Sequence, residues 1–132
     1  MKHLLMETKI VQKICLVDLD GTVCEDIKNE DSHLYATAKL IDGAKEVINS
    51  WYDNGDNITF FTARESKDRD VTLKWLDDNG FKYHGLIMDK PRCLNENSEY
   101  YWLDNKPVRG VTFKGVWSDL VKVNKEISIF KE

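Results

Sequence analysis

The chain has 132 residues, of which 42% are hydrophobic and 32% are charged, and its formal net charge is −4. This composition is typical of one soluble globular domain over residues 1–132, and the acidic balance disfavours general binding to nucleic acid, which requires a basic face. No apolar run approaches the roughly 20 residues of a membrane-spanning helix, and the N-terminal segment is too charged for a secretory signal. We therefore expect a cytoplasmic location and no membrane partner.

The first half of the chain alternates strand and helix. Residues 13–18 contain the continuous apolar run Ile14 to Val17, which predicts a strand buried on both faces of a parallel sheet. Residues 23–41 are polar and lack periodicity, so we interpret them as a loop. Apolar residues at helical spacing predict a helix that opens at residues 42–43 and stops at 53–55. A second strand follows at residues 57–62.

The second half continues this alternation. Ser66 is the predicted N-cap of a helix that ends at Asn79. Two short strands, at residues 84–89 and 99–104, follow it, and a last helix is predicted from about Ser118. The expected inner faces of these two helices are Val71, Trp75 and Leu76 in the first, and Leu120, Val121, Asn124 and Ile127 in the last.

Alternating strands and helices predict an α/β fold, here a three-layer Rossmann-like parallel sheet flanked by helices. The segments between the strands have room for one helix each, so no cap domain is expected. Four aromatic residues at the spacing of these elements are expected in the core rather than at a binding site: Trp51, Trp75, Tyr101 and Trp102.

Polar side chains stand where the predicted strands end. Asp18 ends the first strand and Thr62 the second, whereas Lys90 follows the third and Asp104 ends the fourth. Because ligands of open parallel sheets bind at the carboxyl ends of the strands, we expect these side chains to converge. Carboxylates suit a divalent cation, and a hydroxyl with an ammonium suits a phosphoryl group. The set is complementary to Mg²⁺ and a phosphoryl group.

The same residues lie in motifs that resemble those of the haloacid dehalogenase (HAD) superfamily of phosphohydrolases. DLDGT at residues 18–22 matches its DxDGT signature, and FFTAR at 60–64 resembles its second motif. Lys90 in DKPR resembles the third motif, and YYWLDN at 100–105 the acidic fourth. The chain also looks like small cap-less HAD proteins linked to capsule or lipopolysaccharide biosynthesis.

The resemblance implies roles for the matched residues. Asp18 would be the nucleophile that forms an aspartyl-phosphate, and Asp20 the general acid and then the general base. Mg²⁺ would be held by the Asp18 carboxylate, the Asp20 main-chain carbonyl and Asp104, which leaves the Asp20 side chain free to swing to the leaving group. Many relatives have Asp-Asp in the fourth motif, whereas Asn105 follows Asp104 here. The phosphoryl group would be contacted by Thr62, Lys90, Ala63 and Gly21.

Two arginine residues have two possible interpretations, as contacts for a substrate or as surface charges. Arg64 and Arg92 are candidates for binding an anionic substrate and are equally compatible with solvated surface charges, and Asn105 is a further candidate contact. An uncapped site does not by itself exclude water. We expect it to be covered by residues 23–41 acting as a lid, or by a second copy of the chain.

The leading hypothesis is an Mg²⁺-dependent phosphomonoester hydrolase that acts on a small phosphorylated substrate, such as a sugar phosphate or a nucleotide. One alternative is a 3′-end phosphatase of the polynucleotide-kinase-phosphatase type, which the acidic charge disfavours. The other is a non-catalytic binding module with the HAD fold.

Overall fold

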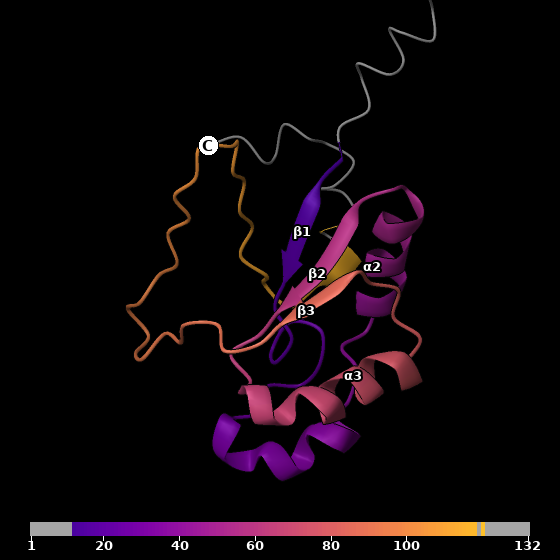
Figure 1. The fold of residues 1–132 in the computed structure, drawn as a ribbon, viewed down its shortest axis with the longest axis vertical. Helices are drawn as coiled ribbons and strands as arrows, with labels where there is room; N and C mark the ends of the chain where they lie inside the picture. The colour runs from indigo at the N-terminus through magenta and orange to yellow at the C-terminus, as the bar shows by residue number, and fades with distance from the viewer. Residues whose placement is uncertain (1–11, 119, 121–132) are drawn as a thin grey trace, which may run out of the picture.

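The computed structural model describes residues 12–118 and 120. Its centre is a three-stranded parallel sheet in the order β1-β2-β3 (Figure 1). The strands are β1 (Ile14–Val17), β2 (Asn57–Phe61) and β3 (Gly85–Ile87). Asn57 of β2 pairs with Ile14, and Gly85 of β3 pairs with Thr59. The parallel sheet is compatible with the predicted α/β Rossmann-like fold.

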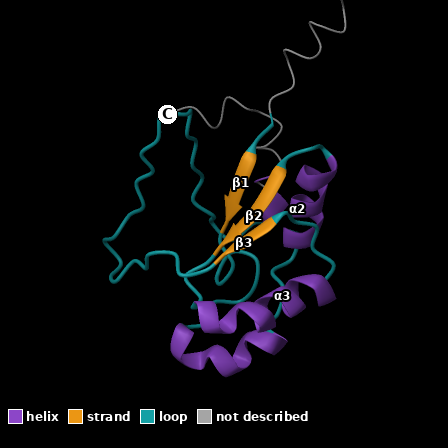
Figure 2. Ribbon diagram, in the orientation of Figure 1, coloured by secondary structure: helices purple, strands orange, loops and turns teal. Residues whose placement is uncertain are grey.

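Helices connect the strands (Figure 2). Parallel neighbours need a crossover of about a dozen residues or more, and α2 and α3 provide these crossovers. α2 contacts β2, whereas α3 and η1 lie side by side, next to the ends to which the strand arrows point. None of the described helices has the length and apolar character needed to cross a bilayer. The helical elements are η1 (Asn29–Thr37), α2 (Ala44–Asp53), η2 (Ser66–Asp68) and α3 (Arg69–Asp78).

The core lies between the sheet and the helices. Ile58 and Phe60 of β2 are fully buried and alternate with half-buried neighbours, as the two-residue period of a strand requires. Trp75 and Leu76 of α3 are buried as predicted, and Val71 packs partly against the same cluster. The sheet and the inner faces of the helices therefore form a single apolar cluster.

The start of α3 differs from the prediction. Ser66 begins the 3₁₀ turn η2, and α3 starts at Arg69 with Asp68 at its N-cap position. The Ser66 hydroxyl and amide both donate to the carboxylate of Asp89 instead. Since Asp89 precedes Lys90, these bonds tie the beginning of this helical segment to the chain that follows β3.

Residues 23–41 are not an open loop. They contain η1, whose Tyr35 is fully buried. A 3₁₀ segment of this kind carries no amphipathic stripe of period 3.6, which is why the hydrophobic pattern did not reveal it. Two main-chain hydrogen bonds of 2.9 Å close the segment at its base, Glu25 N to Lys39 O and Ile41 N to Val23 O.

The predicted fourth strand is absent from the described part of the chain. Residues 99–104 form no strand, and Tyr101 and Trp102, expected in the core, are 86% and 51% exposed. β1 is consequently an edge strand among the described residues. Its first residue, Ile14, is 70% exposed rather than buried on both faces.

The predicted last helix is described only at its beginning. Trp117 and Ser118 are helical, and Trp117 packs into the core. Residues 119 and 121–132, which carry most of the predicted inner face, lie outside the described residues.

A tight turn follows β1 and reverses the chain. Main-chain bonds run from Thr22 N to Leu19 O at 2.9 Å and from Gly21 N to Cys24 O at 2.8 Å. Gly21 has a φ of 84°, a left-handed conformation that costs other residues about 1–2 kcal/mol. A Cβ at Gly21 would be in ordinary contact with Asp26 at 3.6 Å, so the requirement for glycine comes from the backbone angle.

We predict that Gly21→Ala lowers the free energy of unfolding by about 1–2 kcal/mol, because alanine disfavours positive φ. Urea unfolding would measure it. The matched control is Gly110→Ala, where φ is not positive and no atom lies within 4 Å of the added Cβ, with an expected change within about 0.5 kcal/mol. Equal losses in the two variants would contradict the backbone argument.

We also predict that the amides of Glu25 and Ile41 exchange slowly with solvent in the absence of any phosphate ligand, because both are bonded within the closed base of the segment. The exposed residues 99–104 should exchange fast. Hydrogen exchange with residue resolution measures both. Fast exchange at Glu25 and Ile41 would instead support a mobile lid.

Candidate functional site

Asp18 lies directly after β1, at the carboxyl end of the sheet. Its side chain is 36% exposed. The Thr22 hydroxyl donates to Asp18 Oδ2 at 3.0 Å, and the Lys90 ammonium lies 3.6 Å from Asp18 Oδ1. The turn after β1 therefore holds one carboxylate oxygen and leaves the other facing a cation.

Lys90 follows β3 and approaches the same place from the third strand. Its amide donates to Thr62 O at 2.9 Å, and its side chain is 15% exposed. The ammonium lies 4.5 Å from the centre of the Tyr100 ring and 5.6 Å from that of Phe61, within the range of cation–π attraction. The positive charge is thus fixed between a carboxylate and two aromatic rings.

Thr62 follows β2 and completes the row of strand ends. Its hydroxyl accepts a hydrogen bond from the Arg64 amide at 3.1 Å, and its side chain is almost fully buried. The next carbonyl, that of Ala63, accepts from the Asn29 side chain at 2.9 Å. The contacts among Asp18, Lys90 and Thr62 bring three of the four predicted strand-end residues together.

The structure does not bring the fourth, Asp104, to this place. Asp104 is exposed, and its carboxylate accepts bonds from Trp102 Nε1 at 3.2 Å and from the Lys106 amide at 3.1 Å. These bonds lower the pKa of Asp104, and the bond from Trp102 has the larger effect. Asn105 and Arg92, two predicted substrate contacts, are exposed in the same irregular segment, which extends away from the sheet in Figure 1.

The residues predicted to hold Mg²⁺ are therefore only partly assembled. Asp18 presents an accessible carboxylate at the end of β1, next to the turn that carries the Asp20 carbonyl. In the described part of the chain, no group of three or more His, Cys, Asp or Glu side chains is placed to share an ion. The resemblance implies three Mg²⁺ ligands. Because Asp104 is bonded to Trp102 and Lys106, this arrangement of the described residues does not assemble that set.

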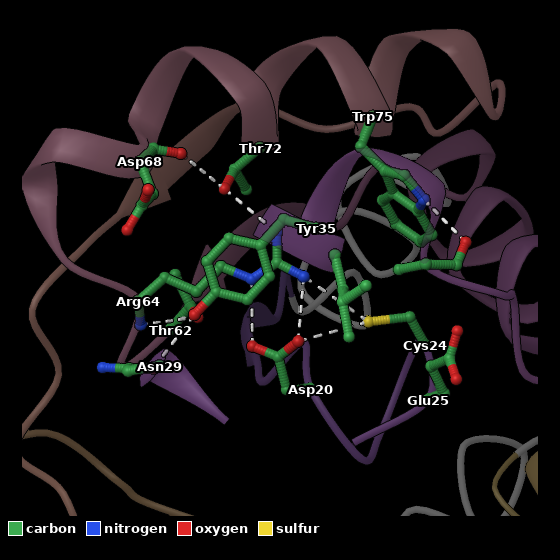
Figure 3. Close-up of polar contacts among 12 residues, drawn as sticks. Asp20, Cys24, Glu25, Asn29, Tyr35, Thr62, Arg64, Asp68, Thr72 and Trp75 are labelled. Carbon is green, nitrogen blue, oxygen red and sulfur yellow. Dashed lines mark hydrogen bonds and ion pairs between the residues drawn. The ribbon is translucent and has the colours of Figure 1, made fainter. Parts of the chain in front are cut away.

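Asp20 differs from the expectation that its side chain is free to move. Arg64 Nε donates to Asp20 Oδ2 at 2.9 Å, and Nη2 donates to Oδ1 at 2.8 Å (Figure 3). Arg64 is fully buried, whereas 14% of the Asp20 side chain is exposed. Burial acts to lower the pKa of Arg64, but its hydrogen bonds to Asp20 and the charge of that carboxylate outweigh burial and leave the pKa raised.

Arg64 is accordingly not on the surface, where an anionic substrate could reach it. The Tyr35 ring centre lies 3.8 Å from its guanidinium carbon, and Nη1 donates to Thr72 Oγ1 at 3.0 Å. Cys24 Sγ lies 3.7 Å from Nη2 and 3.6 Å from Asp20 Oδ1. Figure 3 shows these side chains around the guanidinium.

The thiol of Cys24 and the hydroxyl of Tyr35, which lie beside the Arg64–Asp20 pair, both have raised pKa values. Burial first, and then the charge of Asp20, raises the pKa of Cys24 to about 12 and that of Tyr35 to about 12. Both groups are therefore neutral at physiological pH, and the Tyr35 hydroxyl donates to Asn29 Oδ1 at 3.0 Å. Sequence reasoning missed Tyr35, Thr72 and Asn29, since none lies in a motif; the one available signal was an aromatic residue in an otherwise polar segment.

Solved structures share this fold at low sequence identity. A crystal structure of a protein from Vibrio cholerae covers 90% of this chain and 96% of its own, with 21% identity and a TM-score of 0.60. Two structures of a Pnkp1/Rnl/Hen1 complex, one of them described as an RNA repair complex, cover 67% of this chain at 21% and 19% identity, with TM-scores of 0.54 and 0.53. This chain covers 28% and 32% of theirs. No curated protein matches it.

A family profile identifies the chain more closely. The profile of the LNS2 domain of PITM 1-3 matches residues 15–103, from β1 to the residue before Asp104. The LNS2 domain is lipin/Smp2-like and has a HAD-like phosphatase fold, in agreement with the DxDGT motif at the end of β1. The match spans more than half of the chain, so the protein belongs to the LNS2 domain family and, at the level of the superfamily, to the HAD-like phosphatases.

Proposed function

We propose that the protein is a phosphomonoester hydrolase in which Asp18 attacks phosphorus. The observation that carries this proposal is the position of Asp18, accessible at the end of β1, bonded to Thr22 through one oxygen and facing Lys90 with the other. An attacking carboxylate needs a fixed orientation and a nearby positive charge to receive a phosphoryl group. Both are present at this strand end.

The proposed reaction has two steps. An Asp18 oxygen forms a bond to phosphorus while the bond from phosphorus to the leaving oxygen breaks, and Asp20 donates a proton to that oxygen. Water then attacks the aspartyl-phosphate, Asp20 takes a proton from it, and the bond between phosphorus and Asp18 breaks. The products are an alcohol and inorganic phosphate.

Lys90 is the proposed electrostatic partner of the phosphoryl group. Its ammonium, 3.6 Å from Asp18, would attract the phosphoryl oxygens and stabilise charge in the transition state. Thr62 and the main chain at Gly21 and Ala63 would contact the same oxygens, although the Thr62 hydroxyl already accepts the Arg64 amide.

The proposal includes Mg²⁺ as cofactor, held by the Asp18 carboxylate and the Asp20 carbonyl, with Asp104 as a third ligand. Bound there, the ion would neutralise phosphoryl charge. The present contacts of Asp104 with Trp102 and Lys106 do not support this set, so we derive no step through the ion.

The proposed substrate is a small phosphorylated metabolite in the cytoplasm, such as a sugar phosphate or a nucleotide. The net charge of −4 argues against a nucleic-acid substrate. Tyr100, 56% exposed beside Lys90, would contact the part of the substrate that carries the phosphate. A second copy of the chain is the proposed cover for the open site.

A second candidate function is phosphate binding without turnover. It is favoured by one observation, the position of Asp104 among its neighbours and away from Asp18. Such a module would use Lys90 and the strand ends as an anion site. It would bind phosphate esters and leave them intact.

We predict that Asp18→Asn lowers the rate of hydrolysis of an aryl phosphate at least about a thousandfold, because the amide is not a nucleophile. A steady-state assay measures this, with circular dichroism as a check of folding. Asp26→Asn is the matched control, since Asp26 is an exposed acid beside Gly21 and should retain activity. Beryllofluoride, a mimic of the aspartyl-phosphate, should inhibit the unmodified protein. Activity retained in Asp18→Asn would refute the nucleophile, and an inactive unmodified protein that binds phosphate would favour the second candidate.

We predict that EDTA abolishes the activity and that Mg²⁺ restores it. Asp104→Asn tests whether Asp104 leaves Trp102 and Lys106 when the ion binds: if its carboxylate joins the ion, the Mg²⁺ concentration for half-maximal activity should rise about tenfold or more. Glu99→Gln, a substitution of an exposed acid in the same segment, is the control and should leave the Mg²⁺ titration unchanged. Identical titrations for both variants would remove Asp104 from the metal site.

A further inference from the structure

We propose that Arg64 is a positioning residue that fixes the carboxylate of Asp20 for proton transfer to the leaving group. The inference rests on the proposed function and assigns a role to a buried residue that acts through Asp20, to which it is bonded. It replaces the interpretation of Arg64 as a surface contact for an anionic substrate, because the side chain is fully buried.

The geometry of the ion pair carries the first part of the argument. Two parallel N–H···O bonds of 2.9 and 2.8 Å join one edge of the guanidinium to both oxygens of Asp20. A bidentate pair of this kind fixes the plane of the carboxylate as well as its distance. Lysine, which carries one charge on a flexible stem, cannot reproduce that constraint.

The guanidinium is itself held in place by two other elements of the chain. Its Nη1 donates to Thr72 of α3, and its face lies 3.8 Å from the ring of Tyr35 of η1. The main-chain amide of Arg64 donates to the hydroxyl of Thr62, directly after β2, which fixes the base of the side chain. The Thr72 hydroxyl in turn donates to Asp68 O at 2.8 Å. Asp20 is therefore positioned by a group that the fold holds on several sides.

The paired carboxylate retains the capacity to move protons. A carboxylate has about four lone-pair sites, and Arg64 occupies one on each oxygen. A further neighbour is the weak Sγ–H donor of Cys24 at 3.6 Å. Since 14% of the Asp20 side chain is exposed while Arg64 has no exposure, the open side of the pair belongs to Asp20.

This role has a signature that a merely structural role lacks. Proton donation matters most for a poor leaving group, such as an alkoxide, and little for a stable aryloxide. A misplaced Asp20 should therefore slow hydrolysis of an alkyl phosphate much more than that of an aryl phosphate. Loss of folded protein would lower both rates by the same factor.

The test compares kcat and KM for glycerol phosphate and p-nitrophenyl phosphate in the full chain. Arg64→Lys should lower the ratio of the two kcat values, alkyl over aryl, about tenfold or more, with little change in KM. Asp20→Asn should lower the ratio in the same direction. Arg69→Lys is the matched control, because Arg69, the first residue of α3, donates to Leu86 O at 2.8 Å and is not a partner of Asp20, and it should leave the ratio unchanged.

If Arg64→Lys does not fold, Thr72→Val decides the question. It removes the bond to Nη1 while keeping the charge of Arg64, and a fall in the ratio of about threefold or more is expected. If Arg64→Lys folds and its ratio of kcat values, alkyl over aryl, is unchanged, the positioning role is overturned. If Arg64→Lys does not fold, an unchanged ratio in Thr72→Val overturns it. Neither result would contradict the phosphatase activity. Absence of hydrolysis of both substrates by the unmodified protein would instead overturn the proposed function itself.

Discussion

The buried ion pair between Arg64 and Asp20 is the interaction on which the organisation of this site depends. A fully buried guanidinium is costly unless its charge is paired and its donors are bonded, and the structure meets that demand with Asp20, Thr72 and the ring of Tyr35. Because these partners come from the turn after β1, from α3 and from η1, meeting the demand also brings the three segments together around the end of β2.

This constraint explains how residues 23–41 are held on one side of the site. Residues 23–41 are closed at their base by main-chain bonds and are attached to α3 through Trp75 Nε1, which donates to Ala38 O at 2.9 Å. Tyr35 then lies against Arg64. On the other side, Lys90 links Asp18 to the chain after β3, whose turn is held by the bonds of Ser66 to Asp89. The two carboxylates of the DxDGT motif thus pair with different cations, Asp18 with Lys90 and Asp20 with Arg64.

Much of the fold followed from local pattern. The strands β1, β2 and β3 and the helices α2 and α3 were predictable because the apolar residues of each follow a local pattern, a short apolar run for a strand or helical spacing for a helix, and because Gly55 and Gly80 follow the two helices. The 3₁₀ segment η1 was not, since a single buried tyrosine makes no periodic stripe. The fourth strand was predicted at residues 99–104, which contain the run Tyr100 to Leu103. Such a run does not decide whether a neighbouring strand pairs with it, and here Tyr101 and Leu103 are exposed.

The sequence by itself determined the chemistry available at the strand ends: the DxDGT carboxylates, Thr62 and Lys90, and with them the match to the LNS2 family. These residues are specified by position relative to a strand, which hydrophobic pattern reveals. Tertiary structure alone decided that Arg64 faces inward to Asp20 and that Asp104 stays with Trp102 and Lys106. The reason is physical: the partner of a charged side chain is set by which segments pack together, and arginine has the same appearance in a sequence whether it pairs in the core or is solvated.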